Sequence, residues 1–400
     1  MSSLQSQVIH GIGKTSDRLD TFIKQLDRLE FGTLELHVCG RTFTLNGEHP
    51  GPAGIIEIHR LNALLRSLFL HGDLGLAEAY IRGDWDTPHL SGLLLLLARN
   101  QHRLSRTSDM SRIARLAMRC YHWSRRNTRL GSVRNIMAHY DLGNAFYALW
   151  LDKGMTYSSA IFEQKDETLE SAQANKYERI LDLLEVRPGE RILEIGCGWG
   201  GFAVAAARKG IQVDAVTLSP AQLAWAQRRV QALKLEDMVS LSLEDYRNLQ
   251  GRYDHIVSIE MFEAVGAAYW STYMETLRRL LKPGGRAALQ IITIREQAFD
   301  EYRRNPDFIQ RYIFPGGMLP TPQHLLSHAK SANLQWLRDD SFAEDYAETL
   351  RRWQDKFKNH RENIDALGFD DRFRRLWSLS LIHISEPTRP TATSSMPSSA

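Results

Sequence analysis

The string LEIGCGWGG, residues 193–201, is the stretch whose residue types and spacing point most directly to chemistry. A short apolar run precedes its glycines and a helical pattern follows, so the glycines occupy a strand-to-helix turn. Glycine allows positive φ and lets a ligand approach the backbone closely. Because open α/β sheets bind ligands outside the carboxyl ends of their strands, the string predicts a binding loop. A glycine turn with a purely structural role is the alternative.

The spacing of these glycines indicates the kind of ligand. Gly196, Gly198 and Gly200 form G-x-G-x-G, which differs from the dinucleotide fingerprint G-x-G-x-x-G. The pattern resembles the form most common in S-adenosylmethionine-dependent methyltransferases, whose sites use backbone groups and carboxylates toward a cationic amino-acid sulfonium. We therefore predict S-adenosylmethionine as the cofactor, with Glu194 and Trp199 beside the three glycines.

Two further strand ends extend the predicted cofactor site. Thr217, Ser219 and Gln222 follow the second strand, where many methyltransferases place an acid for the ribose hydroxyls. Hydroxyl and amide groups can make the same hydrogen bonds. Asp245 and Tyr246 follow the third strand, where the adenine would lie, and Tyr246 is expected to stack on it. An ordinary turn is the alternative for this Asp-Tyr pair.

The elements that position these residues alternate between helix and strand from about residue 170. Such alternation predicts a parallel sheet covered on both faces, which is an α/β fold with a Rossmann-like class I methyltransferase domain. We place this domain at residues 135–377. Residues 1–125 are expected to form a smaller N-terminal α+β domain, in which residues 34–45 read as a half-buried strand that residues 53–58 could pair beside.

Composition limits the classes of partner. The chain has 400 residues and a formal net charge of +3, so bulk charge does not demand a nucleic acid. The three cysteines make neither a disulfide framework nor a zinc pattern, and no metal site is expected. The longest apolar run, residues 93–98, is too short to span a bilayer, and the N-terminus lacks a signal-peptide layout. We expect a cytoplasmic protein that meets the inner face of the membrane peripherally.

Residues 99–134 hold ten arginines against one acid, Asp109. One interpretation is a solvated helical linker that runs to about residue 134. The other is a surface that meets a phospholipid membrane, since each basic residue near anionic headgroups contributes about 1 kcal/mol. Tyr121 and Trp123 would suit a membrane interface. No nucleic-acid recognition motif accompanies the arginines, and a homodimer is left open.

After Trp377 the helical pattern gives way to a segment rich in Ser, Thr and Pro. Such a composition cannot bury a core, so residues 378–400 are expected to be disordered or non-native. The string LIHISEPTRP looks like translated sequencing adapter, which suggests a chimeric or truncated reading frame from about residue 378.

Several motifs in order resemble the cyclopropane fatty acid synthases and mycolic acid cyclopropane synthases. His139 to Asn144 and Met155 to Ala160 resemble the "HYD-x-x-N … YS-x-A" segment of that family. The strings LEIGCGWGG, VTLSPAQ, IEMFE and YIFPGG match it too, and the resemblance covers roughly residues 60–377. It implies methyl transfer from S-adenosylmethionine to the cis double bond of unsaturated phospholipid acyl chains, followed by ring closure to a cyclopropane. Tyr140 joins the predicted cofactor-binding residues.

The resemblance also implies a catalytic set. In the family a bound bicarbonate accepts the proton, and the matching positions are Glu263, Tyr346, Ser159, Gln290 and Ile292. Glu263 would orient the bicarbonate and Tyr346 would hydrogen-bond it. Aromatic faces could stabilise the intermediate cation by about 0.5–2 kcal/mol each. The aromatic candidates are Tyr140, Tyr157, Phe262, Tyr312, Phe314 and Tyr346.

Two positions depart from the family pattern, because Ser159 stands where the family has cysteine and Gln290 where it has histidine. Glutamine donates a hydrogen bond but cannot shuttle a proton. A methyl- or methylene-branched product is therefore an alternative to the cyclopropane. The family's further C-terminal cysteine has no match here, which leaves open a catalytically impaired protein that binds S-adenosylmethionine or lipid. A small-molecule or RNA methyltransferase is a third interpretation.

Overall fold

The computed structural model describes residues 19–104, 142–305 and 307–383 apart from residues 25 and 27, together with the backbone of residues 393–395 and 398–399. These residues form two compact units, which are described separately. Tyr140 and nearly all of the arginine-rich segment lie outside the described residues.

The first unit contains a four-stranded mixed sheet with the strand order β2-β1-β3-β4. Its strands are β1 (Phe31–Val38), β2 (Arg41–Asn46), β3 (His49–Ile58) and β4 (Trp85–Asp86). Its helices are α2 (Leu61–His71), α3 (Asp73–Ile81), α4 (Leu90–Arg99), α5 (Gln101–Leu104) and α18 (Asp371–His383).

The single strand expected over residues 34–45 is wrong, because the structure divides it into β1 and β2. The two strands form an antiparallel hairpin in which Val38 faces Arg41. Cys39 and Gly40 between them have φ of 52° and 73°. Two consecutive positive φ angles are typical of the two-residue turns that suit twisted hairpins. The expected pairing of residues 53–58 is confirmed, since β3 runs parallel to β1.

Helix α18 packs on α3 and α4 of the first unit, although it comes last in the sequence. Arg375 forms an ion pair with Asp86 at 2.6 Å and donates to the Tyr80 carbonyl. The helix continues to His383, past the end expected at Trp377, because Leu379, Leu381 and Ile382 on it are buried. The structure therefore groups this helix with the N-terminal unit, whereas the sequence-based boundary placed its first part in the second domain.

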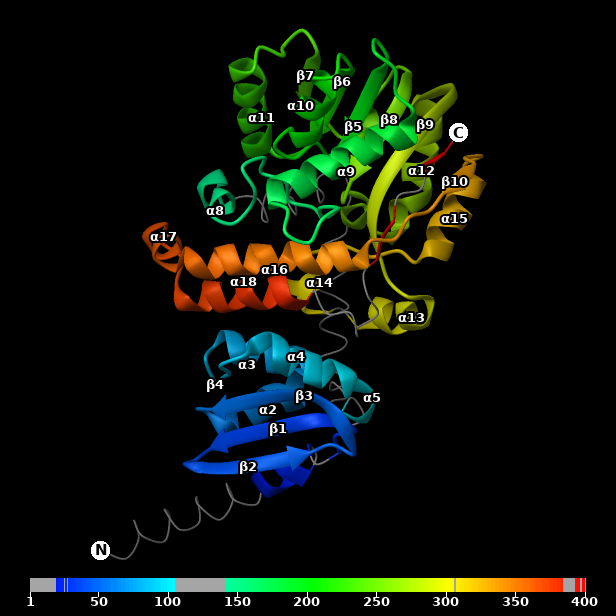
Figure 1. The fold of residues 1–400 in the computed structure, drawn as a ribbon. Helices are drawn as coiled ribbons and strands as arrows, with labels where there is room; N and C mark the ends of the chain where they lie inside the picture. The colour runs from blue at the N-terminus through cyan, green and yellow to red at the C-terminus, as the bar shows by residue number, and fades with distance from the viewer. Residues whose placement is uncertain are drawn as a thin grey trace, which may run out of the picture. The chain divides into compact units, whose positions relative to one another are not determined.

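The second unit is built on a sheet whose five parallel strands have the order β9-β8-β5-β6-β7 (Figure 1). These strands are β5 (Arg191–Ile195), β6 (Gln212–Thr217), β7 (Val239–Leu243), β8 (Tyr253–Ile259) and β9 (Leu281–Thr293). The short strands β11 (Thr393–Ser395) and β12 (Ser398–Ser399) pair antiparallel with β9, and β10 (Trp336–Arg338) pairs antiparallel with β12. The predicted α/β fold is confirmed. The order of the strands reverses between β5 and β8, where such sheets bind ligands.

Helices cover both faces of this sheet. Adjacent residues of one strand enter different buried clusters, as Ile192 and Leu193 of β5 do. This alternation is what a strand buried on both faces requires. The helices of this unit are α8 (Asn144–Ala148), α9 (Leu169–Leu184), α10 (Gly201–Ala207), α11 (Pro220–Ala232), α12 (Trp270–Leu280), α13 (Glu296–Arg304), α14 (Phe308–Tyr312), α15 (Pro322–Ser331), α16 (Ala343–Asn359) and α17 (Arg361–Ala366).

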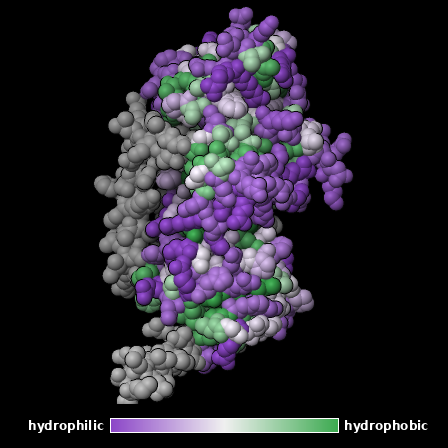
Figure 2. Space-filling model, turned by 90° about the vertical axis from the view of Figure 1, so that its left-hand side faces the viewer, coloured by the Kyte–Doolittle hydropathy of each residue, from purple (hydrophilic) through white to green (hydrophobic). Residues whose placement is uncertain are grey.

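The surface is mainly hydrophilic on the face shown in Figure 2, where hydrophobic side chains form small separate patches. Phe69 and Leu70 are neighbours at the end of α2, and their exposed fractions are 77% and 41%. In the part of the chain that the structure describes, no helix combines the length and the apolar character needed to cross a membrane.

Candidate active site

The glycine-rich loop joins β5 to α10, as the sequence predicts, and its glycines have different roles. A Cβ at Gly196 would lie 2.8 Å from Cγ of Met261, and one at Gly200 would lie 3.1 Å from Cβ of Ala226. These two glycines therefore let neighbouring elements pack closely. Gly198 has a φ of 52°, yet a Cβ there would meet none of the described atoms within 4 Å. Gly198 thus faces open space, where a ligand could approach the backbone.

Hydrogen bonds fix the loop against two other segments. Nε1 of Trp199 donates to Oδ1 of Asn144 at 2.8 Å, and Nδ2 of Asn144 donates to the Ala221 carbonyl at 3.2 Å. The buried Trp199 ring also lies 5.2 Å from the ring of Tyr147. Asn144, the last residue of the HYD-x-x-N motif, therefore ties the glycine loop to the start of α11.

Glu194 lies near the end of β5 and is 2% exposed. Burial raises the pKa of this carboxyl to about 8, and the backbone N–H of Ala203 favours the ionised form. Its Oε2 has no hydrogen-bond partner among the described residues. A buried carboxylate oxygen without a partner is costly, so a cationic ligand group beside the loop would stabilise it. This orphaned acid and the open space at Gly198 fit S-adenosylmethionine, which carries positive charge and supplies the methyl group when bound.

The three predicted residues after β6 come together at the start of α11. The Thr217 hydroxyl donates to Oε1 of Gln222 at 2.9 Å and accepts from the Ser219 backbone N–H at 3.2 Å. Ser219 is the N-cap of α11 and accepts from the Gln222 backbone N–H. All three side chains are buried. The observed bonds shape the helix start, and their predicted contact with the ribose stays a prediction.

Asp245 and Tyr246 follow β7, and both side chains already make contacts within the protein. Asp245 caps a short helix, η2 (Tyr246–Asn248), and forms an ion pair with Arg247 at 2.5 Å. The Tyr246 ring packs edge-to-face on Tyr273, with 5.1 Å between the ring centroids. Burial raises the pKa of Tyr246 to about 12. The ring belongs to the hydrophobic core, and adenine stacking on it stays a prediction.

A second polar centre forms where β8 ends. Oε1 of Glu260 accepts hydrogen bonds from the Ser159 backbone N–H and from Nε2 of Gln290, both at 2.8 Å. Oε2 of Glu260 accepts from the Tyr346 hydroxyl at 3.4 Å. Three of the predicted catalytic residues are thus brought together, and the group on which they converge is the carboxylate of Glu260.

Glu260 is a residue of this centre that the sequence-based prediction missed. Its φ of 48° is unusual for a residue with a side chain, and such a conformation costs about 1–3 kcal/mol. Strained backbone of this kind is often found at functional sites. The available signal was its position directly after a buried strand, at the carboxyl end of the sheet's switch point.

Glu263 lies in the short helix η3 (Phe262–Ala264), one turn beyond Glu260. One of its oxygens accepts a hydrogen bond from the backbone N–H of Ile292, and Oε2 has no partner among the described residues. Burial and the negative charge of Glu260 raise the pKa of Glu263 to about 8. The carboxyl groups of Glu260 and Glu263 therefore lie together in a poorly solvated environment. This favours a proton on one of them at neutral pH.

A bicarbonate does not fit these residues as they stand. The donors expected to bind it, on Ser159, Gln290 and Tyr346, already point at Glu260. The Ser159 hydroxyl donates instead to the Ala160 carbonyl at 3.0 Å. A second anion would have to lie beside the carboxylates of Glu260 and Glu263, and like charges at such a distance repel.

The aromatic candidates separate into two groups. The Tyr157 ring lies 5.4 Å from Trp353 and 6.4 Å from Phe314, which places Tyr157 and Phe314 in one aromatic cluster. Burial and then the negative charge of Glu260 raise the pKa of Tyr346 well above its usual value. In contrast, Phe262 stacks on Trp270 in the sheet core, and Tyr312 packs on Phe308.

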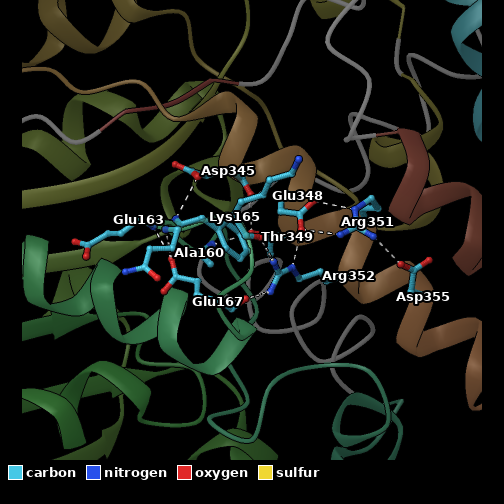
Figure 3. Close-up of polar contacts among 12 residues, drawn as sticks. Ala160, Glu163, Lys165, Glu167, Asp345, Glu348, Thr349, Arg351, Arg352 and Asp355 are labelled. Carbon is cyan, nitrogen blue, oxygen red and sulfur yellow. Dashed lines mark hydrogen bonds and ion pairs between the residues drawn. The ribbon is translucent and has the colours of Figure 1, made fainter.

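Helix α16 carries Tyr346. The same helix also holds the segment from Ala160 to Glu167, which directly follows Ser159 (Figure 3). Oγ1 of Thr349 accepts from the Ala160 backbone N–H at 3.0 Å. Arg352 pairs with Glu348 on its own helix and donates to the Glu167 carbonyl. One rigid element therefore sets the distance between the Tyr346 hydroxyl and the Ser159 backbone.

The parallel sheet, the glycine loop at its switch point and the buried acid at the end of β5 define a class I S-adenosylmethionine-dependent methyltransferase. The chain belongs to the mycolic acid cyclopropane synthetase family, whose model matches residues 127–389. It is therefore a member of the S-adenosylmethionine-dependent methyltransferases that act on fatty acids.

Relatives within the family include enzymes with different products. The chain is 36% identical over 359 residues to the tuberculostearic acid methyltransferase of Mycobacterium tuberculosis, covering 85% of this chain and 81% of that protein. It is 35% identical to the cyclopropane-fatty-acyl-phospholipid synthase of Escherichia coli, with 78% of each chain covered. Among solved structures it resembles the cyclopropane synthase MmaA2 of Mycobacterium tuberculosis, with a TM-score of 0.63 and 29% identity, over 67% of this chain and 98% of that one.

Proposed function

We propose that this methyltransferase forms a methyl- or methylene-branched acyl chain from an unsaturated fatty acyl substrate. The observation that carries the proposal is the carboxylate of Glu260, which receives the hydrogen bonds expected for a bicarbonate. The similarity to tuberculostearic acid methyltransferase supports the same direction. Cyclopropane formation is the competing outcome, supported by the similarity to the Escherichia coli synthase.

The described residues have separable roles in this reaction. The glycine loop and Glu194 would position the cofactor, and an alkene is so weak a nucleophile that this positioning must supply much of the rate. Tyr157 and the aromatic cluster around it would face the cation that forms on the acyl chain. The carboxylate of Glu260, held by Ser159, Gln290 and Tyr346, would accept the proton.

The fate of the C–H electron pair decides the product. When the proton leaves and the pair closes a new C–C bond, the product is a cyclopropane. When a hydride first shifts from the methyl-bearing carbon to the cationic carbon beside it, the cation moves onto the methyl-bearing carbon. A methyl proton then leaves, its C–H pair forms a C=C bond, and the product is a methylene branch. A saturated methyl branch then needs a hydride from a separate reductase and a proton from solvent. Gln290 cannot shuttle the proton onward. We therefore propose that the proton stays on the Glu260 carboxyl until the product leaves.

The test is product analysis with purified protein, S-adenosylmethionine and vesicles of a monounsaturated phospholipid. Cyclopropane and methylene products have the same mass, and ozonolysis cleaves only the methylene form. We expect a cleavable product, turnover that is insensitive to bicarbonate depletion, and loss of turnover in Glu260→Gln. An uncleaved product whose formation requires bicarbonate would overturn the proposal. Normal cofactor binding without turnover would favour the catalytically impaired alternative.

We propose, finally, that the protein works at the inner surface of the membrane, where its acyl substrates are found. The support is the arginine content of residues 99–134, most of which lie outside the described residues. Co-sedimentation with anionic and zwitterionic vesicles tests this contact. We expect binding to the anionic vesicles alone and release by salt, and equal binding to both would contradict it. A homodimer stays a prediction.

A further inference from the structure

The second unit, which holds the candidate active site and is called the catalytic unit below, buries a lysine that none of the proposed steps uses. Lys176 on α9 is 0% exposed, and its Nζ donates to the Ser158 hydroxyl at 2.6 Å. The ammonium also lies 5.1 Å from the centroid of the Tyr177 ring. Burying an ammonium costs several kcal/mol unless opposite charges compensate for lost hydration. The groups around Lys176 must therefore compensate for the cost of burying its charge.

Three carboxyl groups from three separate segments act on the Lys176 ammonium. They are Glu260 after β8, Asp152 after α8 and Glu194 in β5. Burial lowers the pKa of Lys176 to about 8, while these three acids oppose that shift. The pKa of Glu260 is raised by its own burial, and Lys176 counteracts this rise. The positive charge of Lys176 thus acts on both the acid expected at the cofactor and the acid expected at the acyl chain.

Asp152 differs from the other two acids because the backbone already satisfies it. Its carboxylate accepts from the Thr156 N–H at 2.7 Å and from the Gly154 N–H at 2.6 Å. Further charged and titratable groups face the two functional acids from other elements. Those acting on Glu194 include Arg229 of α11, and those acting on Glu260 include Tyr346 of α16 and Glu263 of η3. Lys176 is the cation that acts on both Glu194 and Glu260 among the described residues.

A purely structural role for Lys176, in which it only holds the backbone in place, is less well supported. The hydrogen bond from Lys176 to Ser158 helps to hold the backbone segment in which the next residue, Ser159, binds Glu260. Gln173 on the same helix holds that segment too, since its Nε2 donates to the Ser158 carbonyl at 2.9 Å. Because the backbone has this second anchor, the segment does not depend on the lysine alone.

We propose that Lys176 is a positioning residue that keeps Glu260 anionic from its buried place beside Ser158, whose neighbour Ser159 binds that carboxylate. The inference rests on the proposed function, in which Glu260 accepts the proton. Lys176 touches neither substrate nor cofactor in this role. Its effect is electrostatic, and it also holds the Ser158 hydroxyl.

The test is the pH dependence of turnover in wild type, Lys176→Met and Lys176→Arg. Turnover should fall on the acidic side as Glu260 becomes protonated. In Lys176→Met this acidic limb should move to higher pH by about one unit, which is a roughly tenfold loss of turnover below the limb. Lys176→Arg keeps the charge and should keep the limb near its wild-type position. The matched control is Lys209→Met, which removes a surface lysine paired with Glu178.

Two further results separate charge from packing. Ser158→Ala removes the hydrogen bond and leaves the ammonium, so its acidic limb should not move. The proposal is overturned when Lys176→Met lowers turnover by the same factor at every pH, or when Ser158→Ala shifts the limb as far as Lys176→Met does. If Lys176→Met is too unstable, the Lys176→Arg profile decides, since a displaced limb would contradict the charge role. The limb can be measured on any product, so a cyclopropane product would refute the proposed function and leave this test intact.

Discussion

Replacing Glu194 with glutamine should change how stability depends on pH. Burial raises the pKa of this carboxyl from the ordinary value of 4.5 to about 8. Between those values the folded protein keeps a proton on Glu194 that the unfolded chain has released. The free energy of unfolding therefore contains a contribution that is fully present below pH 4.5 and is lost as pH rises toward 8.

The magnitude follows from the size of this shift. One proton of difference changes the free energy of unfolding by about 1.4 kcal/mol per pH unit. Over the whole window the loss is roughly 4–5 kcal/mol, which is comparable to the total stability of many domains. Glu194→Gln cannot titrate, so its stability should decline less steeply through the same pH range.

The assay is urea unfolding of the cofactor-free protein at several pH values between about 5 and 8. The slope of unfolding free energy against pH should be smaller in Glu194→Gln than in wild type by about one proton. Glu236→Gln is the control, since Glu236 is exposed on the turn after α11. Parallel pH curves for wild type and Glu194→Gln would refute the reasoning, even if the variant were less stable throughout.

Two further predictions concern the supports of the site. Asn144→Ala removes the bonds to Trp199 and to the Ala221 carbonyl, and at about 1 kcal/mol each it should weaken S-adenosylmethionine binding roughly 10–30-fold by calorimetry. Unchanged affinity would contradict the positioning role of Asn144. Arg352→Met should lower turnover about fivefold, because it frees the segment held by α16. Cofactor affinity should stay the same. A variant that loses affinity for S-adenosylmethionine but keeps turnover would contradict this role of Arg352.

Local patterns are sufficient to predict the glycine loop between β5 and α10, because strand, glycines and helix are adjacent in the sequence. The Glu260 centre could not be derived in this way, since its donors come from positions 159, 290 and 346 and meet only in the folded sheet. The pattern of residues 34–45 predicts one strand because its alternation continues through the turn at Cys39 and Gly40.

Lys176 was missed for a related reason. A lysine in an amphipathic helix is normally assigned to the solvated face, and its burial depends on acids contributed by β5 and the end of β8. Tyr246 shows a contact that sequence cannot supply, because its position in the strand series predicts a ligand contact, which stays a prediction, while only the structure shows its packing on Tyr273 in the core. Sequence order places residues at the correct edge of the sheet, and side-chain packing decides which of them face the ligand.

The position of α18 makes the first unit discontinuous in the chain, and this affects how the protein is assembled during synthesis. The helix that covers α3 and α4 leaves the ribosome only after residues 121–368, most of the second unit, have been translated. Until then the surface that receives Trp377 and Leu379 stays open, so the first unit must wait for a contact that spans nearly 300 positions. Contacts of such long sequence separation are slow to form. The catalytic unit can therefore fold before the unit that begins the chain.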